Sequence, residues 1–145
     1  MSSFFLLNRA SSLAPAEPVD LRMVDLANPS LVKEYQLAVR DPVLGLIEGE
    51  YLWAYHHAII TNDNGSRAIS RTNLTTGESQ AWPLPDYWWA GDMMIRNGKI
   101  VLTRRFSLDP NETAGLYEFD PATGKLTQTL ALPGAHLLLL GAAEQ

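Results

Sequence analysis

One turn sequence recurs three times along this chain of 145 residues, and the repeat limits the folds that the chain can adopt. The three copies are Val24–Ser30 (VDLANPS), Thr72–Glu78 (TNLTTGE) and Phe119–Lys125 (FDPATGK). Asn73 follows Asp25 by 48 residues, and Asp120 follows Asn73 by 47. The Asp or Asn can accept a hydrogen bond from the backbone two residues on, and in two copies a glycine follows four residues later, where we expect a positive φ. Each copy therefore predicts a tight turn between two strands.

Alternating apolar and polar residues flank these turns, as in Leu116–Phe119 and Leu126–Leu130 around the third copy. Such alternation over roughly four to eight residues is typical of a half-buried β-strand. A second hairpin precedes each turn, and in the third unit it is marked by Asn97-Gly98, a strong signal for a two-residue β-turn. Long helical periodicity is absent, so the predicted fold class is all-β with antiparallel pairing.

Each repeat unit thus predicts a four-stranded antiparallel meander, whose strands are lettered A to D. Repeated meanders of about 40 to 50 residues are the signature of a β-propeller. We predict a single partial propeller over residues 1–145, and its blades are as follows: strands B to D of the first blade at about 3–40, the second blade at about 41–86, the third at about 87–134, and strand A of the next blade at 135–145. A β-sandwich built from repeated hairpins is the alternative.

About three blades are too few to curve into a ring, because propellers have at least about four. The first unit has no strand A before Phe4–Leu7, and the last strand A, at Leu137–Leu140, has no strands after it. We therefore expect another chain to complete the ring, which is six-bladed if two copies exchange their strands A as a homodimer. A longer propeller, or a ring shared with a different subunit, are the alternatives. The expected inter-chain closure residues are Phe4, Phe5, Leu6, Leu7, Leu137, Leu138, Leu139 and Leu140.

Composition narrows the classes of partner. The net charge of −5 argues against nucleic acid, because phosphate binding needs a surplus of Lys and Arg. The chain has no cysteine, which excludes disulfides and thiolate chemistry. No apolar run approaches the about 18 residues of a membrane span. The start lacks a basic region before its short apolar run, so no signal peptide is expected and a cytoplasmic location is slightly favoured.

The residues best suited to bind a ligand or to catalyse a reaction lie where strands B end and strands A begin. In a propeller the loops at these positions emerge on one face, and loops held by a rigid scaffold are where binding sites usually lie. The candidate ligand- or partner-binding residues are Arg9, His56, His57, Tyr87, Trp88, Trp89, Arg104 and Arg105. Arginines here could hold an anion, and the aromatic run could form a stacking platform.

His56, His136 and Asp86 on the same face could instead hold a divalent metal or act as general acid and base. Adjacent strand residues point to opposite faces, so His56 and His57 cannot bind one metal as a simple pair. The simpler interpretation is that one histidine fills a gap between blades and the other is solvated. We accordingly expect no metal and no other cofactor.

The Asp120–Lys125 turn and its counterpart at Asn73 resemble blades of YVTN-type and related six- to eight-bladed propellers. The resemblance covers most of the chain at the level of the superfold and implies a blade fold. Some similar propellers are sugar-lactone hydrolases with a central metal held by inner-strand Glu, Asn and Asp. The expected inner strands here, Val43–Ile47, Gly91–Ile95 and Leu137–Leu140, are mostly apolar with Asp92 as their lone charge, so that ligand set has no counterpart.

Three functional hypotheses follow. The first is a non-catalytic binding or assembly module that presents its loop face to a protein or a small molecule. The second is a propeller hydrolase or lyase, possibly metal-dependent, acting on a sugar-like or lactone substrate through His56, His136 and Asp86. The third is a purely structural subunit of a larger complex. The expected partner is a second copy or another propeller-forming chain.

Overall fold

The protein is all-β, as its sequence predicts. The computed structural model describes residues 21–39, 41–57, 67–85, 88–104 and 114–132, and the backbone of residues 3–7. Within these ranges eleven strands form three antiparallel sheets. The described residues contain no helix long and apolar enough to cross a membrane. The chain divides into two compact units, Met1–Pro83 and Leu84–Gln145.

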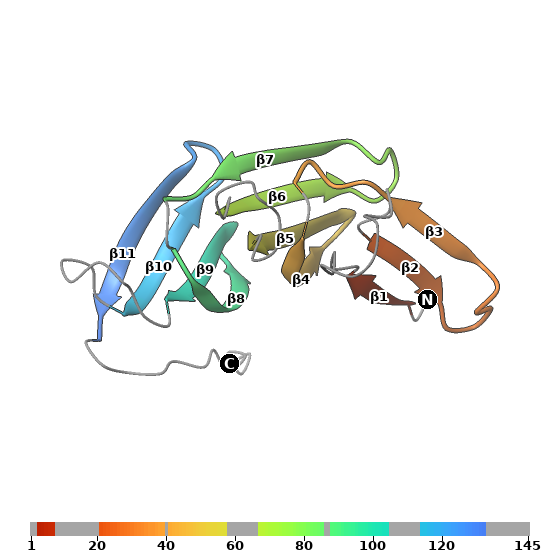
Figure 1. Cartoon of the computed structure of the whole chain (residues 1–145), viewed down its shortest axis with the longest axis horizontal. Helices are drawn as coiled ribbons and strands as arrows, with labels where there is room; N and C mark the ends of the chain where they lie inside the picture. The colour runs from red at the N-terminus through yellow and green to blue at the C-terminus, as the bar shows by residue number, and fades with distance from the viewer. Residues whose placement is uncertain are drawn as a thin grey trace, which may run out of the picture. The chain divides into compact units, whose positions relative to one another are not determined.

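The first unit contains a three-stranded sheet and a four-stranded sheet (Figure 1). The three-stranded sheet has the order β1-β2-β3, and its strands are β1 (Ser3–Leu7), β2 (Leu21–Asp25) and β3 (Val32–Tyr35). The four-stranded sheet has the order β4-β5-β6-β7, and its strands are β4 (Pro42–Glu48), β5 (Tyr51–His57), β6 (Arg67–Asn73) and β7 (Ser79–Pro83). Every neighbouring pair is antiparallel, so both sheets are meanders.

The second unit contains one four-stranded meander, coloured from green to blue in Figure 1. Its strands are β8 (Ala90–Arg96), β9 (Lys99–Arg104), β10 (Gly115–Asp120) and β11 (Lys125–Ala131). The β8–β9 turn contains Asn97 and Gly98 with φ of 52° and 71°, the left-handed pair expected of an Asn-Gly hairpin.

The three repeated turns share one hydrogen-bond pattern. The Oδ1 atoms of Asp25, Asn73 and Asp120 accept from the backbone N–H two residues on, at 2.9, 2.8 and 2.9 Å. In the second and third turns, Gly77 and Gly124 have φ of 79° and 68° and donate to the carbonyl four residues back. The predicted turn chemistry is therefore confirmed at all three positions.

The two four-stranded sheets also share an irregularity. The pairing of β4 with β5 shifts register between Pro42 and Leu44, and that of β8 with β9 shifts between Ala90 and Asp92, 48 residues later. On the partner strands, His56 lies opposite Pro42 and Arg104 lies opposite Ala90. His56 and Arg104 are consequently the same position in two copies of one structural unit.

An apolar core joins the two sheets of the first unit. Its buried members are Leu21, Tyr35, Leu37, Leu52 and Ala54, with Met23 and Leu74 packed against them. Each large apolar side chain buried here contributes about 1.5–3 kcal/mol by removal from water. The alternate residues of β5 thus face the three-stranded sheet, which leaves the intervening residues on the opposite face of β5.

Tyr35 in this core predicts an alkaline limit to stability. Its hydroxyl donates a hydrogen bond of 2.7 Å to the Leu74 carbonyl, and burial raises the pKa of Tyr35 above its ordinary value of 10.0. The folded state prefers the neutral phenol. The contribution of Tyr35 to the free energy of unfolding is therefore fully present below pH about 10 and is lost as the pH rises through the raised pKa.

We expect Tyr35→Phe to lower the free energy of unfolding by about 1 kcal/mol at pH 7, since it removes one hydrogen bond. The difference between the variant and wild type should shrink above pH 10, when the wild-type phenol must ionise. Urea unfolding at both pH values measures it. A difference that stays constant or grows with pH would contradict the argument.

Candidate functional site

His56 lies at the end of β5 and is fully buried. Its Nε2 lies 2.7 Å from the Oγ of Ser70 on the neighbouring strand β6, and Ser70 is also fully buried. A hydroxyl can donate to or accept from an imidazole, so this hydrogen bond satisfies both groups inside the sheet. Neither side chain is accessible to a substrate from solvent. The geometry favours a structural role for His56.

His57 points to the other face of β5, as strand alternation predicts. Arg67 lies directly opposite it on β6, and the Arg67 Nη2 is 3.1 Å from the His57 Nε2. A guanidinium can only donate, so Nε2 must accept and the imidazole is neutral with its proton on Nδ1. Both side chains are buried. This pair is an internal contact, and Arg67 is a residue that the sequence analysis did not single out.

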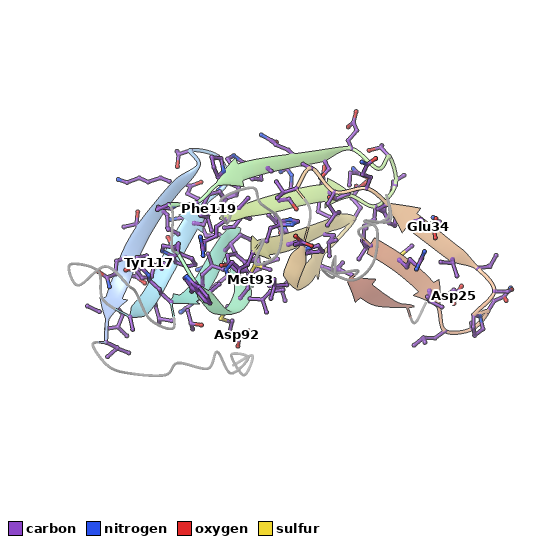
Figure 2. The ribbon with its side chains drawn as sticks, viewed as in Figure 1. Asp25, Glu34, Asp92, Met93, Tyr117 and Phe119 are labelled. Atoms are coloured by element: carbon purple, nitrogen blue, oxygen red, sulfur yellow. The ribbon has the colours of Figure 1, made fainter. Side chains whose placement is uncertain are left out.

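Arg104 and Trp88 are buried together in the second unit, with 1% of each exposed. The Arg104 guanidinium carbon lies 5.9 Å from the ring centres of both Trp88 and Tyr117. The Trp88 and Tyr117 rings meet edge to face, with centres 5.3 Å apart and planes at 89°. Tyr117 is seen on β10 in Figure 2. Trp88 is thus an internal contact, whereas its neighbour Trp89 is half-buried.

The predicted site residues divide between the two units. His56 and His57 belong to the first unit, and Trp88, Trp89 and Arg104 belong to the second. The closure residues Phe4, Phe5, Leu6 and Leu7 form the backbone of β1. The remaining predicted residues lie outside the described part of the chain; they are Arg9, Asp86, Tyr87, Arg105, His136 and Leu137–Leu140. Among the described residues, no three His, Cys, Asp or Glu side chains come together as a metal site.

A second cluster, which we call the aromatic–arginine face, covers one side of β5, β6 and β7. Strand register arranges its residues in three cross-strand rows: Tyr51, Asn73 and Glu78; Trp53, Arg71 and Gln80; and Tyr55, Ile69 and Trp82. Side chains in one row, and diagonal neighbours in adjacent rows, are close enough to interact. This face is opposite to the one that carries Leu52 and Ala54 into the apolar core.

Arg71 lies at the centre of the aromatic–arginine face. Its guanidinium carbon is 4.9, 5.5 and 6.0 Å from the ring centres of Tyr51, Trp53 and Trp82. Trp53 and Trp82 stack on each other with centres 5.8 Å apart and an interplanar angle of 21°. Cation–π contacts of this kind hold a guanidinium while leaving its N–H edge available.

A pocket of about 190 Å³ opens beside Arg71. Its walls are entirely polar or aromatic and come from the first unit: Tyr51, Arg71, Asn73, Glu78, Ser79 and Gln80. It lies toward the repeated turn at Asn73, the opposite end of the sheet from His56. The candidate residues predicted from sequence in this sheet, His56 and His57, lie at that other end. The sequence signal that could have identified this pocket is the alternation along the strands, which puts Tyr51 and Trp53 on one face of β5, and Arg71 and Asn73 on one face of β6.

Comparisons with known proteins identified no similar protein. A scan against protein-family models, a search of curated proteins and a search of solved structures each found no match.

Proposed function

We propose that the protein is a non-catalytic binding and assembly module of the β-propeller type, whose β1 strand pairs with a strand of a second copy. The observation that carries the proposal is the edge of the three-stranded sheet. Within the described residues β1 pairs on one side only, with β2, so its other edge offers a row of backbone N–H and C=O groups. Such an edge is a template for a strand from another chain.

The repeat supports treating each sheet as a blade. The two four-stranded sheets share strand order, turn chemistry and the position of a register shift. The three-stranded sheet has the same repeated turn between β2 and β3. It therefore corresponds to strands B to D of a blade, and one added strand beside β1 gives it the fourth.

The burial of the candidate histidines supports a binding role over hydrolysis. General acid–base catalysis needs a side chain within hydrogen-bond reach of the substrate. His56 is fully buried against Ser70, and His57 accepts from Arg67 inside the sheet. In the second unit we propose Trp89, which is half-buried, for partner or ligand contact, ahead of Trp88, which is buried beneath Arg104.

Light scattering of the purified protein tests the assembly. We expect a species of twice the 16.0 kDa of one chain. A stable species of 16.0 kDa across micromolar concentrations would refute the proposal.

Proline substitutions in β1 locate the contact. Successive backbone N–H groups of an antiparallel strand point to opposite edges, so Phe4→Pro and Phe5→Pro remove N–H groups from different edges. One variant should lose pairing with β2 and unfold more easily. The other should fall to the mass of a single chain while keeping its circular dichroism spectrum. If neither variant changes the mass, β1 is not the assembly edge.

A further inference from the structure

We propose that the pocket beside Arg71 binds a small zwitterion of the α-amino acid class. The ligand carboxylate would pair with the Arg71 guanidinium, and its ammonium group with the Glu78 carboxylate. The site is separate from the β1 edge, so the inference goes beyond the assembly function and does not depend on it.

Within the described residues, the Arg71 guanidinium forms no ion pair. Across the described residues, its contacts are the three aromatic rings, with no ion pair or hydrogen bond. Arg71 is half-buried as a residue, and its guanidinium carbon lies over the Tyr51 and Trp53 rings. A guanidinium carries parallel N–H donors, which match a carboxylate in bidentate fashion. This side of the pocket selects a planar monoanionic group.

Glu78 supplies the opposite charge in the same pocket. The Asn73 N–H donates to the Glu78 carbonyl at 2.8 Å, which places Glu78 in the row next to Arg71 and on the same face. Diagonal residues of adjacent strands are about 7–8 Å apart at their Cα atoms. Glu78 and Arg71 form no ion pair with each other, so a ligand with both charges can bridge them. A purely anionic ligand would instead be repelled by Glu78.

The surroundings reinforce this preference. Asn73 donates through Nδ2 to the Glu50 carboxylate at 3.3 Å, which puts a second acid next to Asn73. Its Oδ1 already accepts from the N–H groups of Thr75 and Thr76, so this oxygen is engaged within the turn. Tyr51 and Gln80 also line the pocket.

The pocket suits a small ligand. With a volume of about 190 Å³ and an opening to solvent, it is large enough for L-alanine, which carries both charges. Larger amino acids would project their side chains out of the pocket past Gln80, which is exposed.

Three probes that share an ethyl skeleton separate the two charges. L-Alanine has both groups, propionate lacks the ammonium, and ethylamine lacks the carboxylate. The purified full chain is titrated with each probe while the indole N–H resonances are followed by NMR, with assignment from Trp53→Phe, Trp82→Phe and Trp89→Phe variants and Trp88 assigned by elimination. We expect L-alanine to saturate and to shift the Trp53 and Trp82 signals but not those of Trp88 and Trp89. Propionate and ethylamine should bind at least tenfold more weakly.

Two variants test the roles of the charged residues. Arg71→Lys keeps the charge but loses the bidentate fork, and we expect about tenfold to hundredfold weaker L-alanine binding, as for the loss of a charged hydrogen bond. Glu78→Gln, at an exposed position, should abolish the preference for L-alanine over propionate. Circular dichroism and thermal melting establish that both variants are folded. The proposal is overturned if L-alanine does not saturate, if propionate binds wild type equally well, or if folded Arg71→Lys binds L-alanine unchanged.

Discussion

Replacing Trp53 with alanine should lower the free energy of unfolding by about 3–5 kcal/mol, the usual cost of deleting a buried large aromatic side chain. Trp53 lies in the central strand β5 with 4% of its surface exposed. Its ring stacks on Trp82 and lies under Arg71. Alanine would leave a cavity, expose one face of Trp82 and remove the support for the guanidinium. Since whole domains are stable by only about 5–15 kcal/mol, this is a large fraction of the total.

Trp53→Phe is the matched control. The Trp53 Nε1–H is buried with no hydrogen-bond acceptor among the described residues, so phenylalanine keeps an aromatic ring and removes an unsatisfied donor. The lost area and the removed donor act in opposite directions, and the net cost should be under about 1.5 kcal/mol. Urea unfolding followed by circular dichroism compares both variants. Equal destabilisation by alanine and phenylalanine would show that the indole, and not the aromatic packing, stabilises the sheet.

The features predicted correctly from sequence are those that depend on neighbouring residues. An Asp or Asn side chain reaches only the backbone a few residues away, so the turns at Asp25, Asn73 and Asp120 follow from local chemistry. The same holds for the Asn97-Gly98 hairpin. Once the turns are known, the alternation on each side predicts which residues share a face, and the all-β class follows.

Side-chain contacts between strands that are joined by a long connection could not be predicted from local sequence. His57 and Arg67 meet because β5 and β6 pair in one particular register. The sequence of residues 58–66 contains Asn64-Gly65, but this connection is too long for a two-residue turn to define the register. A slip of one residue would move Arg67 to the other face. The aromatic–arginine face depends on the same register, which is why Arg71 was not identified as a site residue.

The burial of a polar side chain also could not be predicted from its residue type. His56 and Arg104 occupy equivalent positions and look chemically suited to bind ligands, yet both are buried. Their neighbours explain the difference between them: the sheet of the first unit supplies the Ser70 hydroxyl to His56, whereas the second unit supplies the Trp88 and Tyr117 rings to Arg104. A polar residue at a strand end is therefore available to bind a ligand only if its side chain is not already buried in contacts with neighbouring residues of its own unit.

Gly115→Ala should destabilise the second unit by about 3 kcal/mol, near the upper end of typical overpacking costs. Gly115 begins β10, where the pairing with β11 shifts register just after Leu116. A Cβ at Gly115 would clash with the Leu130 carbonyl oxygen and would lie 3.1 Å from the Gln128 Nε2. The Leu130 oxygen is backbone, so relief requires β11 itself to move and lose hydrogen bonds to β10.

The equivalent residue in the first unit provides the control. Gly115 lies opposite Arg104, and Ala68 lies opposite His56, so the two occupy one repeat position. The register of β6 with β7 is regular through Ala68, where a methyl group is accommodated. Ala68→Gly should cost only about 1 kcal/mol, from chain entropy and one lost methyl. Urea unfolding of both variants compares these costs. Gly115→Ala could instead lower the free energy of unfolding no more than Ala68→Gly does. That result would show that β11 shifts easily and that the register shift between β10 and β11 does not require a glycine at position 115.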